Sequence, residues 1–274
     1  MKLAARAVAL LVLAASLAVP ATPAAQETAA VYQGAAAEAF LAKAKVVAVK
    51  DLGSGITNPQ KATLALDGVT RFAVFKSIDE SKQGVTRFGD GSVEVDFQDS
   101  WQTEVAAYQV DLMIGLGLVP ATIERRIGNS VGSLQWWVES MMPEAQRVKD
   151  KVSPPDVEAW NRLMFKVRLF DQLIANVDRH LNNILVTKDF DVRLIDHSRA
   201  FRATRELKNP DDLKRFSKSL LDGITRLNQR DLRAKVSRYL TSPQIDRLLQ
   251  RRDAILALVK KRIAEQGEAA VIYP

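Results

Sequence analysis

The sequence predicts an α+β fold in two lobes, with strands concentrated in the first half and helices in the second. Residues 45–76 have the pattern of strands, and Phe72, Val74 and Lys76 share one face in the two-residue period. From about residue 155 onward, apolar residues recur with the 3.6-residue period of helices. We therefore expect an N-lobe over residues 26–137, a C-lobe over residues 138–274, and a ligand cleft between them.

Residues 1–25 have the pattern of a secretory signal peptide. Lys2 and Arg6 form a positive start, residues 7–19 are apolar, and Pro20 ends the apolar run. That run is too short to span a bilayer comfortably. The sequence therefore predicts an exported protein, secreted or periplasmic, with no transmembrane segment in the mature chain. Because the chain has no cysteine, it has neither a disulfide nor a site for a lipid anchor.

The N-lobe pattern predicts a hairpin followed by one helix. The strands "ATLAL" and "VTRFAVFK" flank Asp67-Gly68, a dipeptide that favours a tight turn. Residues 77–99 are rich in glycine and charge, and we expect them to form an exposed insertion. A helix is predicted to follow Ser100, its N-cap. Glu104 lies one turn before Tyr108 on this helix, hence close to its buried face.

The C-lobe pattern predicts one long helix, a small hairpin and three more helices. The long helix extends from about Pro155 to Val177, and the hairpin covers residues 184–195. The later helices are expected near residues 210–224, 229–240 and 243–265. The last helix is basic and amphipathic, and we interpret its charged face as a solvated one.

Two polar segments flank the small hairpin. "IANVDRHLNNILV" precedes the first strand, and "VRLIDHSRAF" includes the second. Antiparallel pairing brings Asn183 and Asp196 to the same end of the hairpin, and Asp178 lies on the loop just before it. Their oxygens suit a hard cation such as Mg²⁺. In the alternative interpretation, Asp178 and Asn183 only cap the helix end and the turn.

"DRHLNN…LID" resembles the catalytic and metal-binding segments of atypical kinases, a group that includes the phosphoinositide 3- and 4-kinases, the secretory-pathway kinases of the Golgi and the HipA-type kinases. The resemblance implies that Asp178 orients or deprotonates the acceptor hydroxyl. It also implies that Asn183 and Asp196 hold Mg²⁺ or Mn²⁺ on the phosphates of ATP. His180 would organise the loop or help to move a proton, although a packed loop histidine is an open alternative.

Other segments match the same group in the expected order. The resemblance implies that Lys76 binds the ATP phosphates, that Glu104 pairs with Lys76, and that Val74 lies against adenine. The loop "GSGIT" would cover the phosphates through Gly53, Ser54 and Gly55, and "WWVES" would be the connector that reads the adenine edge, represented here by Val138. Each of these residues alone has an ordinary structural explanation, and their order carries the resemblance.

The sequence departs from ordinary protein kinases after Asp196. No glycine follows this aspartate, and no long activation segment is present. The chain then continues with the basic residues Arg199, Arg202, Arg205 and Lys208, which suit an anionic acceptor or simply a solvated loop. The acceptor itself is unknown, and we expect a monomer. No aromatic-basic platform for nucleic acid is present.

The kinase interpretation has three rivals. AMP transfer would use the same cleft with ATP reversed, and a pseudokinase would bind nucleotide without turnover. A metallohydrolase could use Asp178, His180, Asp196 and His197, but hydrolytic metal sites usually contain more than two histidines. The function that the sequence favours is an exported atypical kinase that phosphorylates a hydroxyl of a protein, lipid or small molecule.

Overall fold

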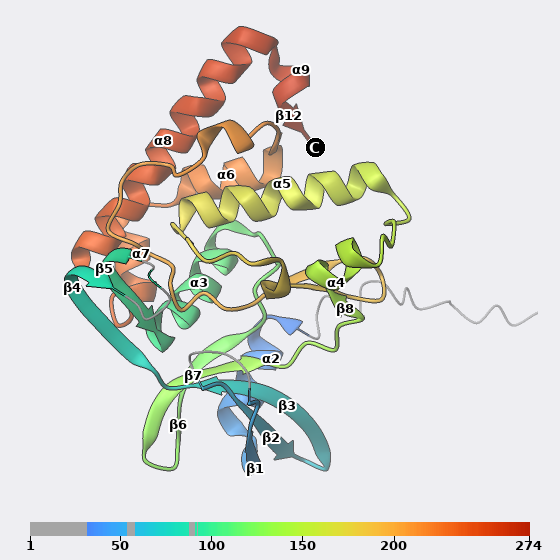
Figure 1. The fold of residues 1–274 in the computed structure, drawn as a ribbon, viewed down its shortest axis with the longest axis vertical. Coiled ribbons are helices and arrows are strands. Elements are labelled where there is room, and N and C mark those ends of the chain that lie inside the picture. The colour runs from blue at the N-terminus through green and yellow to red at the C-terminus, as the bar shows by residue number, and fades with distance from the viewer. Residues whose placement is uncertain (1–31, 54–57, 88–90, 92) are drawn as a thin grey trace, which may run out of the picture.

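The computed structural model describes residues 32–53, 58–87, 91 and 93–274. Its first part is built on a five-stranded antiparallel sheet, and its second part is mostly helical (Figure 1). This confirms the predicted α+β class and the order of strands before helices. The signal-peptide prediction for residues 1–25 lies outside the described residues. Among the helices of the described part, none is both long and apolar enough to cross a membrane.

The sheet has the order β1-β2-β3-β7-β6. Its strands are β1 (Lys45–Asp51), β2 (Gln60–Leu66), β3 (Val69–Lys76), β6 (Thr122–Ile127) and β7 (Ser130–Trp136). The turn between β2 and β3 is the predicted one, and Asp67 and Gly68 have φ angles of 49° and 76°. Two successive positive φ angles match the twist of a two-residue hairpin, which explains why Asp-Gly stands there. Helix α2 (Ala35–Lys43) packs against β6 and β7.

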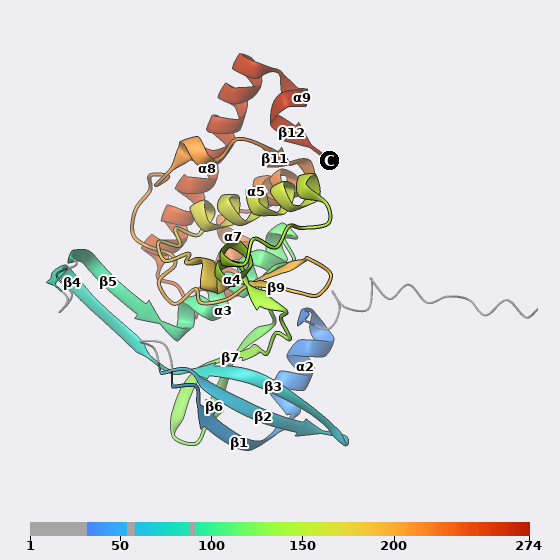
Figure 2. The ribbon, with the colours of Figure 1, turned by 45° about the vertical axis from the view of Figure 1, so that its right-hand side comes forward.

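The segment that we expected as an exposed insertion forms a second hairpin, with a shift of register between Lys82 and Val85. Its strands β4 (Asp79–Arg87) and β5 (Val93–Ser100) pair only with each other. They project from the body of the molecule, as Figure 2 shows. Cross-strand pairing bonds one edge of each of these two strands, although the segment is rich in glycine and charge. Strand β5 leads directly into helix α3 (Trp101–Ile114), whose N-cap is Ser100 as predicted.

Helix α3 lies between the sheet and the later helices. It packs against β6 and β7 on one side and against α6 (Lys218–Arg226) and α7 (Gln229–Val236) on the other. The contact with α6 is very close at Gly223, where an added Cβ would lie 2.0 Å from the carbonyl oxygen of Ile114. Only glycine permits this approach. Helix α3 is therefore part of both halves of the core.

The second half contains the predicted long helix and small hairpin. Helix α5 (Val157–Leu173) and strands β9 (Ile184–Val186) and β10 (Val192–Leu194) lie within the expected ranges. Strand β8 (Met142–Pro143) adds a third strand to the hairpin. The remaining elements are α4 (Glu144–Lys149), β11 (Phe216–Ser217), α8 (Ser242–Gln266), α9 (Glu268–Val271) and β12 (Ile272–Tyr273).

The helix expected near residues 210–224 is shorter than predicted. Pro210–Asp212 form a single 3₁₀ turn, and α6 begins only at Lys218. Between them, Phe216 and Ser217 pair in parallel with Ile272 and Tyr273. A pairing partner more than fifty residues away in the chain therefore competes with local helix formation at this position.

Candidate active site

A cleft of about 560 Å³ lies between the sheet and the small hairpin. This volume is in the range of small-molecule sites. Three parts of the chain line the cleft. The sheet and the loop between β1 and β2 contribute Leu52, Pro59, Val74, Lys76 and Gln135. The connector contributes Trp136, Trp137, Val138 and Ser140. The hairpin segment contributes Asn182, Asn183, Leu185, Ile195 and Asp196.

Lys76 joins the two halves of the cleft. Its Nζ lies 2.5 Å from Oε1 of Glu104 on α3 and 2.7 Å from Oδ1 of Asp196 after β10. Burial alone would lower the pKa of Lys76, but the two carboxylates raise it above its ordinary value. Lys76 therefore stays a cation at the inner end of the cleft, where it can receive an anionic group.

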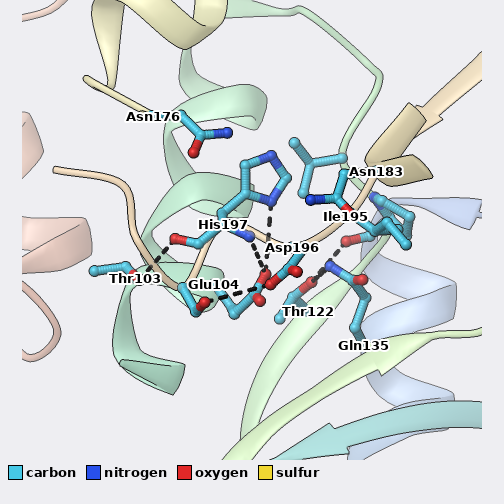
Figure 3. Close-up of polar contacts among 12 residues, drawn as sticks. Thr103, Glu104, Thr122, Gln135, Asn176, Asn183, Ile195, Asp196 and His197 are labelled. Carbon is cyan, nitrogen blue, oxygen red and sulfur yellow. Dashed lines mark hydrogen bonds and ion pairs between the residues drawn. The ribbon is translucent and has the colours of Figure 1, made fainter. Parts of the chain in front are cut away.

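Glu104 is fixed from two sides. Its second carboxylate oxygen, Oε2, accepts a hydrogen bond from the backbone N–H of His197 at 3.0 Å. Burial would raise the pKa of Glu104, but the ammonium of Lys76 and the contacts with His197 hold it well below its ordinary value. Figure 3 shows Glu104, Asp196 and His197 gathered at this point. A buried, ionised glutamate thus holds the lysine and the segment after Asp196 in place.

His197 connects this group to the loop before the hairpin. Its Nε2 lies 2.9 Å from Nη2 of Arg179, and a guanidinium can only donate, so Nε2 accepts. The ring proton then belongs on Nδ1, which lies 3.5 Å from Oε2 of Glu104. Burial lowers the pKa of His197, which favours this neutral form. The ring is fully buried, which suits a structural role for His197.

Arg179 holds the polar loop together. Its Nε and Nη2 donate to the carboxylate of Asp171 at 3.0–3.2 Å. Its Nη1 donates to the backbone carbonyls of Asn183 at 3.0 Å and Ile195 at 2.8 Å. The guanidinium thus binds both segments that flank the hairpin, together with His197. Arginine in the "DRH" segment and histidine in the "IDH" segment are therefore parts of one network.

Asn183 and Asp196 both present oxygens to the cleft. The side-chain amide of Asn183 donates through Nδ2 to the backbone carbonyl of Asp178 at 3.3 Å, which leaves its Oδ1 as an acceptor. Asp196 adopts a φ of 61° and uses Oδ1 for Lys76 and for the hydroxyl of Ser198 at 3.3 Å. No described residue is bonded to its Oδ2.

Asp178 lies apart from these two side chains, toward the loop after Asp196. Its Oδ1 is 2.6 Å from Nε2 of His180, and its Oδ2 is 3.4 Å from Nη1 of Arg199. The carboxylate is partly exposed, and His180 is largely exposed. Asp178 is therefore accessible, and it sits between two potential hydrogen-bond donors.

The structure brings together most of the residues that the sequence singled out. Val74, Lys76, Val138, Asn183 and Asp196 line the cleft, and Glu104 supports Lys76 from behind. Gly53 lies next to the cleft residue Leu52 and has a φ of 65°. The predicted phosphate-covering residues Ser54 and Gly55 lie outside the described residues.

Four buried polar residues at or behind the cleft were not predicted. Asp171 and Arg179 form the ion pair behind the loop, and Gln135 lines the inner wall. Asp99, the fourth, is buried beside Ser198, and its burial raises its pKa. A charged residue on the buried face of α5 is the signal that could have revealed Asp171, because buried charges are usually paired.

The fold is similar to that of several solved structures, two of which are described as kinases. Hydra Fam20, solved with sugar, matches with a TM-score of 0.64 and 16% identity over 86% of this chain and 90% of that chain. The Golgi casein kinase matches with a TM-score of 0.58 and 15% identity over 86% and 76% of the two chains. The Helicobacter pylori proinflammatory kinase CtkA matches with a TM-score of 0.52 and 12% identity over 82% and 98%.

Comparisons of the whole sequence do not make this connection. No protein-family model matches the chain, and no curated protein sequence matches it. The identities with the solved structures are low, so the likeness concerns the fold. The resemblance to the phosphoinositide 3/4-kinases and to HipA stays a prediction. The chain has an atypical kinase-like fold, and the polar cluster around Lys76 lies in the cleft of that fold.

Proposed function

We propose that this protein is an atypical kinase that transfers the γ-phosphoryl group of ATP to a hydroxyl group. The observation that carries the proposal is the position of Lys76 between Glu104 and Asp196 in a cleft of about 560 Å³. A buried cation that is held by two carboxylates from different elements suits a bound phosphate. The fold likeness to solved kinases supports the same conclusion.

The oxygens of Asn183 and Asp196 fit a Mg²⁺ or Mn²⁺ ion. One carboxylate oxygen and one amide oxygen face the cleft without a described hydrogen-bond donor. Mg²⁺ sites in phosphate-binding proteins commonly use one or two carboxylates and complete their shell with phosphates and water. When bound, the ion would neutralise charge on the phosphates. No group of three or more acidic, histidine or cysteine side chains suited to a metal occurs in the described part of the chain, so a dense hydrolytic site has no support there.

The transfer itself needs positioning more than covalent chemistry by the protein. Lys76 binds phosphate oxygens, and Val74 and Leu185 offer apolar surface to the base. The acceptor oxygen forms a bond to the γ-phosphorus while the bond from that phosphorus to the β–γ bridging oxygen breaks. The hydroxyl proton passes to the carboxylate of Asp178, whose side chain is partly exposed.

The acceptor and the place of action belong to the proposal as well. We expect export through residues 1–25, and one of the similar solved structures is described as a Golgi kinase. The basic residues beside Asp178 favour an anionic acceptor. Nη1 of Arg199 lies 3.4 Å from Oδ2 of Asp178, and Arg202 follows three residues later in the chain.

A labelled-nucleotide experiment tests the function. The mature chain is incubated with γ-labelled and, separately, α-labelled ATP and Mn²⁺, alone and with extracts of candidate acceptors. Transfer of the γ label supports the kinase, and transfer of the α label would show AMP transfer instead. The variant Asp196→Asn should lose both transfer and divalent-dependent ATP binding while it keeps its fold. ATP binding without any transfer would leave a nucleotide-binding module and contradict the proposal.

A further inference from the structure

Gln135 forms part of the inner wall of the cleft. It is the penultimate residue of β7, directly before the connector, and only 7% of its surface is exposed to solvent. In the sheet it lies opposite Val74 of β3 and Thr122 of β6. Side chains of directly opposed residues project from the same face of a sheet. Gln135 therefore faces the cleft beside Val74, and both residues line it.

The orientation of the Gln135 amide is determined by its neighbour. The hydroxyl of Thr122 donates to the backbone carbonyl of Pro120 at 2.8 Å, and a carbonyl can only accept. A hydroxyl has a single hydrogen, so Thr122 can only accept from Gln135, whose Nε2 lies 2.9 Å away. Figure 3 shows this contact between Thr122 and Gln135. The opposite amide atom, Oε1, must then point away from Thr122.

Oε1 of Gln135 is an acceptor that the protein does not use. No described donor is bonded to it, and it is not among the sealed side-chain atoms that lack a partner. It therefore keeps contact with the space of the cleft that Gln135 lines. Around it the cleft is largely apolar, with Val74, Leu185 and Ile195 among its lining residues. In such surroundings an unpaired carbonyl favours a ligand that brings a donor.

We propose that Gln135 is a specificity-determining residue that accepts a hydrogen bond from the exocyclic amino group of the nucleotide base. The inference rests on the proposed function and specifies its nucleotide as one with a 6-amino purine. Apolar side chains hold a planar base between them, so that its edge meets Gln135 and the adjoining connector. A 6-oxo purine, as in ITP or GTP, would place one acceptor against another.

The amide cannot adapt to a 6-oxo base without loss. If it turned over, Oε1 would face the Thr122 oxygen, whose only hydrogen is already bonded to Pro120. Two acceptors would then oppose each other in a fully buried place, because Thr122 has no exposed surface. Thr122 and Pro120 thus act as positioning residues for Gln135. Together the three residues select a base that donates a hydrogen bond to Oε1 of Gln135.

The test compares three nucleotides by competition binding to the full chain with Mn²⁺. The probes are ATP, ITP and purine riboside triphosphate, which has hydrogen at the 6-position. The parent should bind ATP about 10- to 100-fold more tightly than either of the other two. Gln135→Met removes the acceptor and should bring the three affinities close together. Thr122→Val frees the amide to turn, so ITP should gain on ATP specifically.

A matched control is Thr225→Val. The hydroxyl of Thr225 bonds only to the carbonyl of Leu221 in its own helix, so the variant should keep the parental preference for ATP. Thermal midpoints show which variants fold. If Gln135→Met does not fold, the relative affinities of Thr122→Val for ITP and ATP decide the question. Equal affinity of the parent for ATP and ITP would overturn the inference and leave the proposed kinase intact. If Gln135→Met lost the same affinity for all three nucleotides, Gln135 would only pack against the base, and the inference would also be overturned. A parent that binds no nucleotide would overturn the proposed function, and the inference with it.

Discussion

The carboxylate of Asp178 has two hydrogen-bonding neighbours. His180 and Arg199 each approach one oxygen of its carboxylate, at 2.6 Å and 3.4 Å. A carboxylate in this position can organise the loop, accept a proton from an acceptor hydroxyl, or do both. Substitution by asparagine separates the two roles, because an amide keeps the size of the side chain but cannot take the proton.

Asp178→Asn should destroy phosphoryl transfer and spare nucleotide binding. We expect turnover to fall by a factor on the order of 10² to 10⁴, the usual loss for a general base. Stability should change by at most about 1 kcal/mol, as for the loss of a capping interaction. The measurement combines thermal midpoint, ATP affinity and turnover. Unchanged turnover with a lowered midpoint would assign Asp178 to the fold alone.

A second prediction at this scale concerns pH. Burial lowers the pKa of His197 below its ordinary value of 6.5, so the folded chain resists protonation where the unfolded chain accepts it. Stability should therefore fall as the pH drops below about 6.5. Glu104, whose pKa is held low in the folded chain, adds to this loss below its ordinary value of about 4.5. Protonation of either group at low pH therefore destabilises the folded chain.

The measurement is the thermal midpoint between pH 7 and pH 5 without nucleotide. His197 should contribute a slope of up to about 1.4 kcal/mol per pH unit. In His197→Asn the midpoint should be lower at pH 7 but should change less over this interval. The same pH dependence in variant and parent would show that other groups cause the acid sensitivity.

The hairpin β9–β10 and its two flanking loops form the central element of the site. Arg179 binds the carbonyls at both ends of the hairpin and pairs with Asp171 on α5. A planar guanidinium with five donors can do this, whereas an ammonium group cannot reach several acceptors in fixed directions. The alignment of Asn183 with Asp196 thus depends on a residue that does not itself line the cleft.

Arg179→Lys should therefore weaken both the fold and the site. We expect a loss of about 2 to 4 kcal/mol in the free energy of unfolding, because the pair with Asp171 is largely buried. ATP affinity with Mn²⁺ should fall as well. The matched control is Arg162→Lys, since Arg162 makes an exposed pair with Glu158, worth less than about 1 kcal/mol. Equal effects of the two substitutions in denaturant titrations would contradict the role of Arg179.

Local elements were predictable from the sequence because their signals are local. The turn at Asp67-Gly68, the N-cap Ser100 and the hairpin after Asn183 each depend on a few neighbouring residues. The order of Lys76, Glu104 and Asp196 indicated the cleft through a resemblance. The lobe boundary at residue 137 and the functional roles of the site residues stay predictions.

Features that depend on distant partners were not predictable. Gln135 owes its orientation to Thr122 and Pro120, a relation that appears only when β6 and β7 pair. The helix expected at residues 210–224 was too long because Phe216 and Ser217 pair with the C-terminal strand instead. In both cases a partner far away in the chain outweighs the local pattern.

At the scale of the whole molecule, α3 joins the sheet to the helical part. Its N-terminal end is bonded to the segment after Asp196, through Ser100 N to Ser198 O at 2.9 Å and Thr103 Oγ1 to His197 O at 2.8 Å. Beyond its C-terminal end, Leu118 accepts a bond from Leu194 of β10 at 2.9 Å. The segment from Ser100 to Leu118, which contains α3, is thus bonded at one end to residues after the hairpin and at the other end to β10.

Gly223→Ala tests how much the site depends on this attachment. The new Cβ would overlap the carbonyl of Ile114 and must push α6 away from α3. We expect a loss of about 1 to 3 kcal/mol or more in stability, as for overpacked cores. A fall in ATP affinity should accompany it, because Glu104 moves with α3. Asp222→Ala, at the exposed neighbouring position of α6, should change stability by less than about 0.5 kcal/mol.

If Gly223→Ala lowered stability but left ATP affinity unchanged, the packing of α3 on α6 would matter for folding and not for the site. Both quantities are available from a thermal melt performed with and without nucleotide, since a ligand that binds only the folded chain raises the midpoint according to its affinity.

The two-ended attachment of α3 also bears on control. To draw Glu104 away from Lys76, the helix would have to break the bonds that Ser100 and Thr103 make with the segment after Asp196. Rotating this helix away from Lys76 is therefore costly. Under the proposed function, the protein would need no activating signal to form the pair between Lys76 and Glu104. Its output would follow the supply of nucleotide and acceptor in the compartment where it is placed, so that location takes over the task that a molecular switch performs elsewhere.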